Sequence, residues 1–152
     1  MASDSSCIFC KIIKGEIPSL KIIETPLSYS FFDIQPTARG HILIIPKYHG
    51  AKLHNLPDEN LADILPIAKK IAIASGLDID SPEGTGYNIL QNNGRIAHQV
   101  VDHVHFHLIP KRDTKTGLVV GWPAEDADFG DLKAQQQEIL TKLKESGLIS
   151  EN

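Results

Sequence analysis

The chain has 152 residues, of which 41% are hydrophobic, and this length predicts one globular domain with a single core. Lysine and arginine number 15 against 19 acidic residues, a formal net charge of -4, which argues against a polybasic surface for nucleic acid or anionic lipid. No apolar run approaches the ~20 residues that span a bilayer, and no basic and then apolar leader opens the chain. We therefore expect an intracellular protein, cytoplasmic and also nuclear, with no membrane or nucleic-acid partner.

The start of the chain predicts a loose segment followed by a short helix. Residues 1–6 are polar, and we expect a flexible N-terminus before an ordered domain that spans 7–152. Residues 9–18 can form one or two helical turns, which Gly15 and Pro18 would end.

Three runs rich in isoleucine, phenylalanine and tyrosine follow, at 20–25, 29–34 and 41–46. The first two are separated by a turn around Pro26 and predict strands joined as a hairpin. The third run, HILIIP, is almost wholly apolar, which is typical of a strand that is buried on both faces. We place it at the centre of a sheet.

Residues 57–76 predict the main helix. Pro57 suits a first turn, apolar residues recur at helical spacing, and Gly76 supplies an end. Pro66 lies inside this segment and removes a backbone donor, so we expect a kink or an early break there.

The second half of the chain predicts two more strands, at 86–91 and 102–110, joined by a loop rich in asparagine and glycine. An extension that starts near residue 123 ends in a helix. That helix has an apolar stripe, formed by Leu132, Ile139, Leu140 and Leu143. Strands grouped around one long helix indicate an α+β fold with a mainly antiparallel sheet.

The segment HVHFHLIP has histidines at alternate positions, His103, His105 and His107. Because side chains alternate across a strand, all three rings should share one face, with neighbours about 6.6 Å apart. A single strand histidine is usually an ordinary surface or core residue. Burial of three imidazoles costs free energy unless each one is hydrogen-bonded or holds a ligand, so the cluster indicates a functional site.

Two kinds of chemistry compete for this site. Histidines two residues apart can bind a catalytic zinc, but such a site usually includes a carboxylate, and Asp102 should point to the opposite face. A neutral histidine is also a good nucleophile towards phosphorus. The upstream stretch NNGRIAHQ offers amide groups suited to a phosphate, so we favour nucleophilic chemistry.

Four blocks together carry a specific resemblance. They are, in chain order, CIFCKIIKGEIP, FFDIQPTARGHILIIPKYH, NNGRIAHQ and QVVDHVHFHLIP. In this order they resemble the histidine triad (HIT) family, over about residues 7–122, and within it the Hint branch. The stretches after Asp33 and around VGWPAE resemble the fungal members of that branch.

The resemblance implies a HIT fold, in which each subunit has a five-stranded antiparallel sheet, one long helix and a C-terminal helix. It implies a homodimer that hydrolyses the P–N bond of adenosine 5'-phosphoramidates, such as AMP-lysine, AMP-NH2 and aminoacyl adenylates. The reaction would need no cofactor and would pass through AMP bound to histidine. Trp122 and the acidic residues after it lie where Hint proteins contact the partner subunit.

The resemblance also assigns roles to the histidines. His105 is the expected nucleophile, His107 the residue that contacts the transferring phosphate or the leaving group, and His103 a residue that fixes the ring network. His41 matches the family's fourth histidine, although alone it would be read as a polar residue at a strand end. The group that protonates the departing amine is left unassigned.

The nucleotide-binding residues are expected by the same resemblance. Asp33 matches the acid that binds the ribose hydroxyls, although alone it would be a turn residue. The residues that match the adenine pocket, each of which could equally belong to the core, are Ile8, Phe9, Ile12, Ile17, Phe32, Ile34 and Leu43. Asn92, Gly94 and Gln99 match the phosphate site. Val100 replaces a serine found in other members, so only its backbone N–H is available there.

A second site is indicated by Cys7 and Cys10, which can place two thiolates on one metal or can pack as reduced core cysteines. A tetrahedral zinc needs two more ligands, and the resemblance supplies His49 and His98. We therefore expect a structural zinc bound by Cys7, Cys10, His49 and His98, which takes no part in the chemistry.

Two other functions stay open at this point. A dinucleoside polyphosphate hydrolase of a neighbouring HIT branch would release a nucleotide in place of an amine. A nucleotide-binding regulator or scaffold would retain the fold with only incidental hydrolysis.

Overall fold

The structure is a computed structural model that describes residues 2–150, and the chain divides into two compact units, Met1–Val119 and Val120–Asn152. The boundary lies close to residue 123, the expected start of the C-terminal extension. The first unit contains all the strands, and the second contains one long helix. No helix within residues 2–150 is long and apolar enough to cross a membrane.

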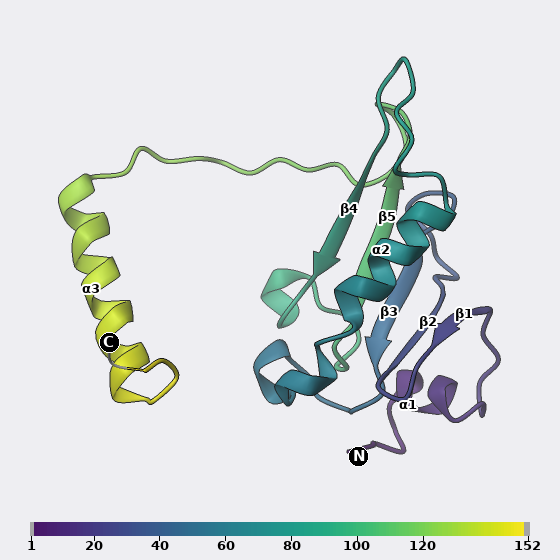
Figure 1. Cartoon of the computed structure of the whole chain (residues 1–152), viewed down its shortest axis with the longest axis horizontal. Coiled ribbons are helices and arrows are strands. Elements are labelled where there is room, and N and C mark those ends of the chain that lie inside the picture. Colours follow the sequence, from purple (N-terminus) through teal and green to yellow (C-terminus); the bar gives the residue numbers. More distant parts are fainter. Residues whose placement is uncertain (1, 151–152) are drawn as a thin grey trace. The chain divides into compact units, whose positions relative to one another are not determined.

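One antiparallel sheet of five strands, in the order β1-β2-β3-β5-β4, forms the first unit (Figure 1). This confirms the predicted α+β fold and the central position of the HILIIP strand. The strands are β1 (Lys21–Glu24), β2 (Ser28–Phe32), β3 (Ile42–Pro46), β4 (Gly86–Gln91) and β5 (Phe106–Lys111).

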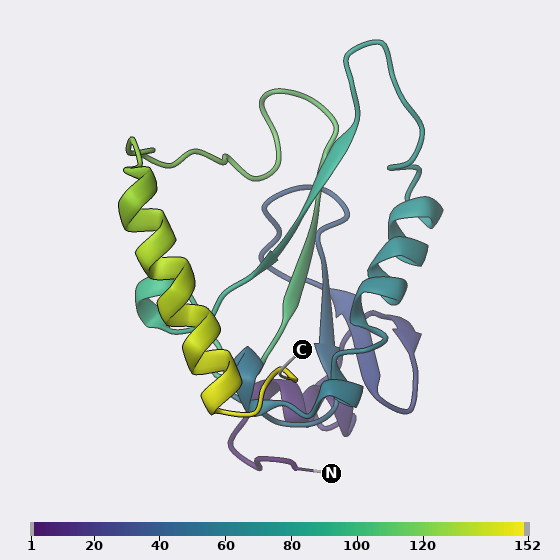
Figure 2. The same cartoon turned by 60° about the vertical axis from the view of Figure 1, so that its left-hand side comes forward.

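The two faces of the sheet are covered by different helices. Ile42 and Ile44 of β3 pack against α2 (Ile64–Ala74), which lies over one face of the sheet (Figures 1 and 2). The alternate residues Leu43 and Ile45 pack in a second cluster with residues of α1 (Ile8–Ile13). Both sets are buried, which agrees with the apolar sequence of β3 and its predicted burial on both faces.

The main helix begins later than expected. A 3-10 turn at Asp58–Asn60 comes first, and α2 starts at Ile64. Pro66 is then the third residue of α2, where a backbone N–H has no acceptor within the helix. The expected kink is therefore replaced by a helix that starts two residues before the proline. Two further 3-10 turns are Leu53–Asn55 and Arg95–Ala97.

The strand that carries the histidines is also shorter than expected, because β5 begins at Phe106. The β3–β5 ladder ends at the pair Ile44 and Phe106, and Pro46 has no N–H with which to extend it. Instead, the N–H of Val104 donates to Gly50 O at 2.8 Å. His103 and His105 thus precede the ladder, whereas His107 pairs with Leu43 within it.

The start of the chain is hydrogen-bonded to the rest of the first unit. The N–H of His49 donates to Ala2 O at 2.8 Å, and the N–H of Cys7 donates to Asp4 O at 3.1 Å. Met1 lies outside the described residues. The stretch expected to be flexible therefore includes two residues, Ala2 and Asp4, with defined backbone bonds.

The second unit contains α3 (Phe129–Glu145), the long helix near the C-terminus (Figure 2). It starts where the carboxylate of Asp128 accepts from the N–H of Asp131 at 2.9 Å. The predicted helix is confirmed. None of its residues is buried, and Leu132 and Ile139 are exposed.

Candidate active site and metal centre

One ring nitrogen of His105 is hydrogen-bonded, and the other has no partner among residues 2–150. Its Nδ1 lies 2.7 Å from the backbone oxygen of His103, and because a carbonyl only accepts, Nδ1 carries the proton. The ring is buried beside Phe9, at 5.1 Å between centroids, and this burial lowers its pKa. At neutral pH the imidazole is therefore neutral, and the lone pair is on Nε2.

A chain of hydrogen bonds fixes the protons of the other two rings. The N–H of Thr37 donates to Nδ1 of His41 at 3.0 Å, so the proton of neutral His41 is on Nε2. That Nε2–H donates to Nδ1 of His107 at 2.9 Å. His107 must then carry its own proton on Nε2. The rings form a row, with centroids 5.1 Å apart for His41 and His107 and 5.0 Å apart for His107 and His105.

Burial keeps this row neutral. It lowers the pKa of His107 to about 4, and the neighbouring histidines add to the effect. Burial also lowers the pKa of His41, although the carboxylate of Asp33 acts in the opposite direction. The site can therefore hold neutral imidazoles as both acceptor and donor at physiological pH.

Asp33 lies beside the row of rings, as the sequence predicted for a residue of the same site. Its Oδ2 is 3.5 Å from Nε2 of His41, and its Oδ1 accepts from the N–H of Gln35 at 2.8 Å. One ligand atom each from Asp33, His41 and His107 lies within 4.8 Å of the others, so a divalent cation could also be held here.

The expected phosphate loop is built differently from the prediction. The side chain of Gln99 is buried, and its Nε2 donates to Ala51 O at 2.6 Å and Val101 O at 3.0 Å. Its Oε1 accepts from the N–H of Gly94 at 2.7 Å. Gln99 and the Gly94 amide are therefore occupied by the protein and build the loop instead of facing a ligand. Asn92 donates to His98 O at 3.3 Å, which leaves its side-chain oxygen for other partners.

Val100 is exposed, and because valine is apolar its side chain offers no hydrogen bond to a phosphate. The apolar residues expected at the adenine pocket divide into two sets. Three are buried in the cluster between α1 and the sheet, Phe9, Ile12 and Leu43, and Ile17 packs against them. Three keep exposed side chains that a base could cover, Ile8, Phe32 and Ile34.

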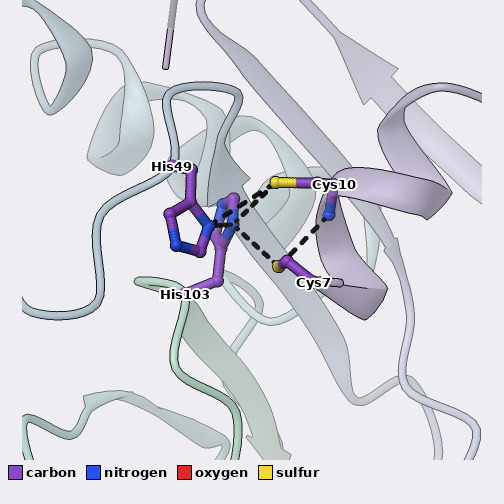
Figure 3. A group of neighbouring side chains, drawn as sticks. All are labelled: Cys7, Cys10, His49 and His103. Atoms are coloured by element: carbon purple, nitrogen blue, oxygen red, sulfur yellow. Dashed lines mark hydrogen bonds between the residues drawn. The ribbon is translucent and has the colours of Figure 1, made fainter. Parts of the chain in front are cut away.

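A second group forms at the start of α1, where Cys7, Cys10, His49 and His103 converge (Figure 3). Nδ1 of His103 is 3.4 Å from Sγ of Cys7 and 3.6 Å from Sγ of Cys10. Nδ1 of His49 is 3.5 Å from Sγ of Cys10 and 3.2 Å from Nδ1 of His103. Three of the four expected ligands are thus brought together, and His103 stands where His98 was expected.

These separations fit a tetrahedral metal. A zinc ion with ordinary bond lengths separates its sulfur and nitrogen ligands by about 3.5 Å and two nitrogen ligands by about 3.3 Å. Nε2 of His103 lies 2.8 Å from Pro46 O and therefore carries the proton, which leaves the Nδ1 lone pair directed at the sulfurs. The donor set is that of a closed structural zinc site.

The sequence prediction is thus corrected at the fourth ligand, which is His103 and not His98. His98 ends the 3-10 turn at Arg95–Ala97 with a positive φ of 68°, and its side chain is exposed. His103 was expected among the catalytic rings because strand alternation placed it there. The β3–β5 ladder begins only at Phe106, so the His103 ring does not follow the strand alternation and points towards α1. The position of His103 at the first, loop-side end of the triad is the signal that could have indicated this.

Comparison with known proteins identifies the family. The family model described as the HIT domain matches residues 14–114, more than half of the chain. The chain belongs to the HIT family. This HIT chain is 67% identical over 147 residues to a Candida albicans protein named adenosine 5'-monophosphoramidase, covering 94% of this chain and 97% of the relative. A Saccharomyces cerevisiae protein of the same name is 65% identical over 143 residues, covering 94% and 86%.

Solved HIT structures share the fold. A histidine triad nucleotide-binding protein from Candida albicans superposes with a TM-score of 0.88 at 64% identity, covering 92% of this chain and 99% of the other. A HIT family protein from Bacillus subtilis gives a TM-score of 0.82 at 33% identity, covering 97% and 100%.

Proposed function

We propose that this HIT protein is an adenosine 5'-monophosphoramidase, a hydrolase that cleaves the P–N bond between AMP and an amine. Three fungal relatives that are 57–67% identical carry this name. The observation that carries the proposal is the tautomer of His105, whose Nδ1–H is held by the His103 carbonyl so that Nε2 is left as a neutral nucleophile.

In the first step, Nε2 of His105 attacks phosphorus, a new N–P bond forms, and the P–N bond to the amine breaks. The amine leaves with a proton taken from solvent, and the Nε2–H of His107, fixed by the hydrogen-bond chain, donates a hydrogen bond to the reacting phosphate or the leaving nitrogen. The ring of His105 becomes cationic when it takes AMP, and the His103 carbonyl on its Nδ1–H stabilises that charge.

In the second step, water attacks the phosphorus of the AMP–histidine intermediate. The N–P bond breaks, AMP leaves, and neutral His105 is restored. The water gives up a proton to solvent as it attacks, which returns the proton that the amine took up in the first step. The catalytic cycle therefore balances, and it uses no cofactor.

Asp33 is proposed to bind the ribose. A carboxylate can accept from both the 2' and the 3' hydroxyl, which favours a ribonucleotide over a deoxyribonucleotide. The exposed apolar side chains of Ile8, Phe32 and Ile34 supply contact area for the adenine ring.

Zinc is proposed at the group of Cys7, Cys10, His49 and His103. The ion would crosslink α1 to the segments that carry the two histidines, and it supplies no step of the reaction. The described cysteines are free thiols, so a reducing compartment, the cytoplasm with the nucleus, fits the site. Fluorescence microscopy of a tagged full-length chain tests that location.

We also propose that the protein is a homodimer. The stretch that leads into α3 exposes Val119, Val120 and Trp122, and α3 itself buries no residue. Such apolar side chains are typical of a surface that a second subunit covers.

One assay tests the proposed activity. Purified protein is given AMP-lysine or diadenosine tetraphosphate, beside the variant His105→Ala. Release of AMP from AMP-lysine, lost in the variant, supports the proposal, and mass spectrometry of quenched reactions should find AMP on His105. Faster turnover of the dinucleotide would establish the neighbouring hydrolase activity instead, and turnover of neither substrate would favour a nucleotide-binding regulator.

A further inference from the structure

One residue, His103, belongs to both sites. Its ring nitrogen Nδ1 is one of the four donors of the cysteine–histidine group, 3.4 Å from Sγ of Cys7. Its backbone oxygen accepts the Nδ1–H of His105 at 2.7 Å. Because ring and carbonyl are parts of the same residue, a metal that shifts this residue through its ring also shifts the oxygen that orients the nucleophile.

The sheet does not hold this residue in place. The β3–β5 ladder ends at Phe106, so His103 and His105 lie beyond the last paired residue. The His103 ring is held by the bond from Nε2 to Pro46 O at 2.8 Å and by the cysteine–histidine group. The peptide unit that contains the His103 carbonyl is held by the N–H of Val104, which donates to Gly50 O at 2.8 Å, and Gly50 follows His49 of the same group. The position of the carbonyl therefore depends on the segments that this group joins.

A second contact connects the same two sites. Phe9 lies between the cysteines in α1, and its ring contacts His103 at 5.8 Å and His105 at 5.1 Å between centroids, edge-on in both cases. A metal that draws Cys7 and Cys10 towards His103 also sets the position of Phe9 against the nucleophile.

We propose that the cysteine–histidine group is a positioning device for the nucleophile, so that zinc bound there sets the pose of the His105 ring and with it the rate of P–N cleavage. The ion touches no substrate. The rate effect rests on the proposed function, whereas the effect on the ring does not. Cys7, Cys10 and His49 are then positioning residues that act through His103.

The first test observes the ring without any substrate. Metal-free protein with nitrogen-15 in its histidines is titrated with zinc up to one equivalent per chain. The limit matters because excess zinc could reach Asp33, His41 and His107. We expect the signals of His105 to shift or sharpen together with those of His49 and His103, and exchange of the His105 Nδ1–H with water to slow. Unchanged His105 signals beside shifted His49 and His103 signals would overturn the proposal.

The second test separates rate from binding. Removal of zinc from the protein with a chelator should lower the rate of AMP transfer to His105 by about tenfold to a hundredfold, because small misplacements of a reacting group cost that much. The dissociation constant of AMP should change much less than the rate does, because Asp33, Phe32 and Ile34 lie outside α1 and only Ile8 of the proposed nucleotide contacts is on it. Zinc added back should restore the rate. An equal loss of binding and rate, or no loss of rate, would overturn the proposal.

Variants of α1 provide the matched controls. Cys10→Ser should lose zinc and show the same slow transfer, whereas Ile13→Val, on the same helix but outside the group, should keep both zinc and rate. Melting curves identify a variant that has unfolded, in which case the chelation experiment decides. If wild-type protein with zinc hydrolyses no phosphoramidate, the proposed function fails, and the histidine spectra still decide the coupling.

Discussion

At the scale of single residues, the site depends on which nitrogen of each histidine is already bound. Nε2–H of His103 donates to Pro46 O, and Nδ1–H of His105 donates to the carbonyl of His103. Nδ1 of His107 accepts from Nε2–H of His41. Three histidines of one motif are thus left with three different functional atoms: a metal-binding lone pair, a nucleophilic lone pair and a hydrogen-bond donor.

The ribose proposal predicts the effect of Asp33→Asn. The amide keeps one acceptor for the N–H of Gln35 but cannot accept from both ribose hydroxyls. We expect KM for AMP-lysine to rise by about tenfold to a hundredfold, the cost of one or two hydrogen bonds to a charged group. The 2'-deoxy substrate should lose less. Asp102→Asn is the exposed control, and equal losses for the two substrates would contradict the assignment.

The buried histidines predict a loss of stability in acid. Burial holds the pKa of His107 at about 4 in the folded chain, against an ordinary value of 6.5, and it also lowers the pKa of His41. Between pH 6.5 and pH 4 the unfolded chain therefore binds more protons, so stability is full above this window and falls as the pH drops through it.

Melting curves of metal-free protein should show this fall, at about 2–4 °C for each kcal/mol lost. His107→Gln, which cannot take the proton, should flatten the curve. A wild-type melting temperature that is constant across this window would contradict the neutral state of the row. A chelator in every sample keeps loss of zinc out of the comparison.

The resemblance to the HIT family predicted which side chains meet better than residue patterns did. It assigned Asp33, His41 and His107 to one site, and the structure brings them together, whereas patterns alone indicated a turn residue at Asp33 and a strand-end residue at His41. The use of His103 depends on where β5 begins, and the alternation of the motif carries no information about that. The occupied state of Gln99 likewise depends on backbone groups that are distant in sequence.

At the scale of elements, apolar patterning predicted the strands better than the helix starts. HILIIP is apolar on both faces and became the central strand β3. The start of α2 was predicted too early because Pro57 and the acids after it satisfy a 3-10 turn equally well. The start of β5 was predicted too early because a proline on the neighbouring strand, and not its own sequence, ends the ladder.

The loop between β4 and β5 predicts a large effect of Gln99→Ala. The variant leaves the N–H of Gly94 and the oxygen of Ala51 without their partner in a buried place. We expect a loss of about 1–3 kcal/mol, measured by urea unfolding, together with reduced activity as the loop loosens. Gln135→Ala on the exposed surface of α3, which also removes a hydrogen-bonding amide, should cost less than about 0.5 kcal/mol. Equal effects of the two substitutions would show that Gln99 does not hold the loop.

At the scale of the whole molecule, α3 is the helix that no packing within its own unit stabilises. Within the second unit its 17 residues bury no side chain, and an isolated helix of this length is marginal in water. Leu132 and Ile139 are exposed and Leu140 and Leu143 only partly covered, so the helix needs a partner for this stripe. The proposed second subunit can provide one.

The dimer proposal therefore predicts that charges on this stripe release monomers. We expect Ile139→Asp combined with Leu143→Asp to halve the mass measured by light scattering at micromolar concentration, because a buried interface cannot pair the new carboxylates. Lys133→Asp and Lys144→Asp, which change charge on the same helix without removing apolar area, should leave the dimer intact. A mass that stays dimeric in both double variants would place the subunit contact elsewhere. A monomeric wild type would show that the stripe needs a partner other than a second copy.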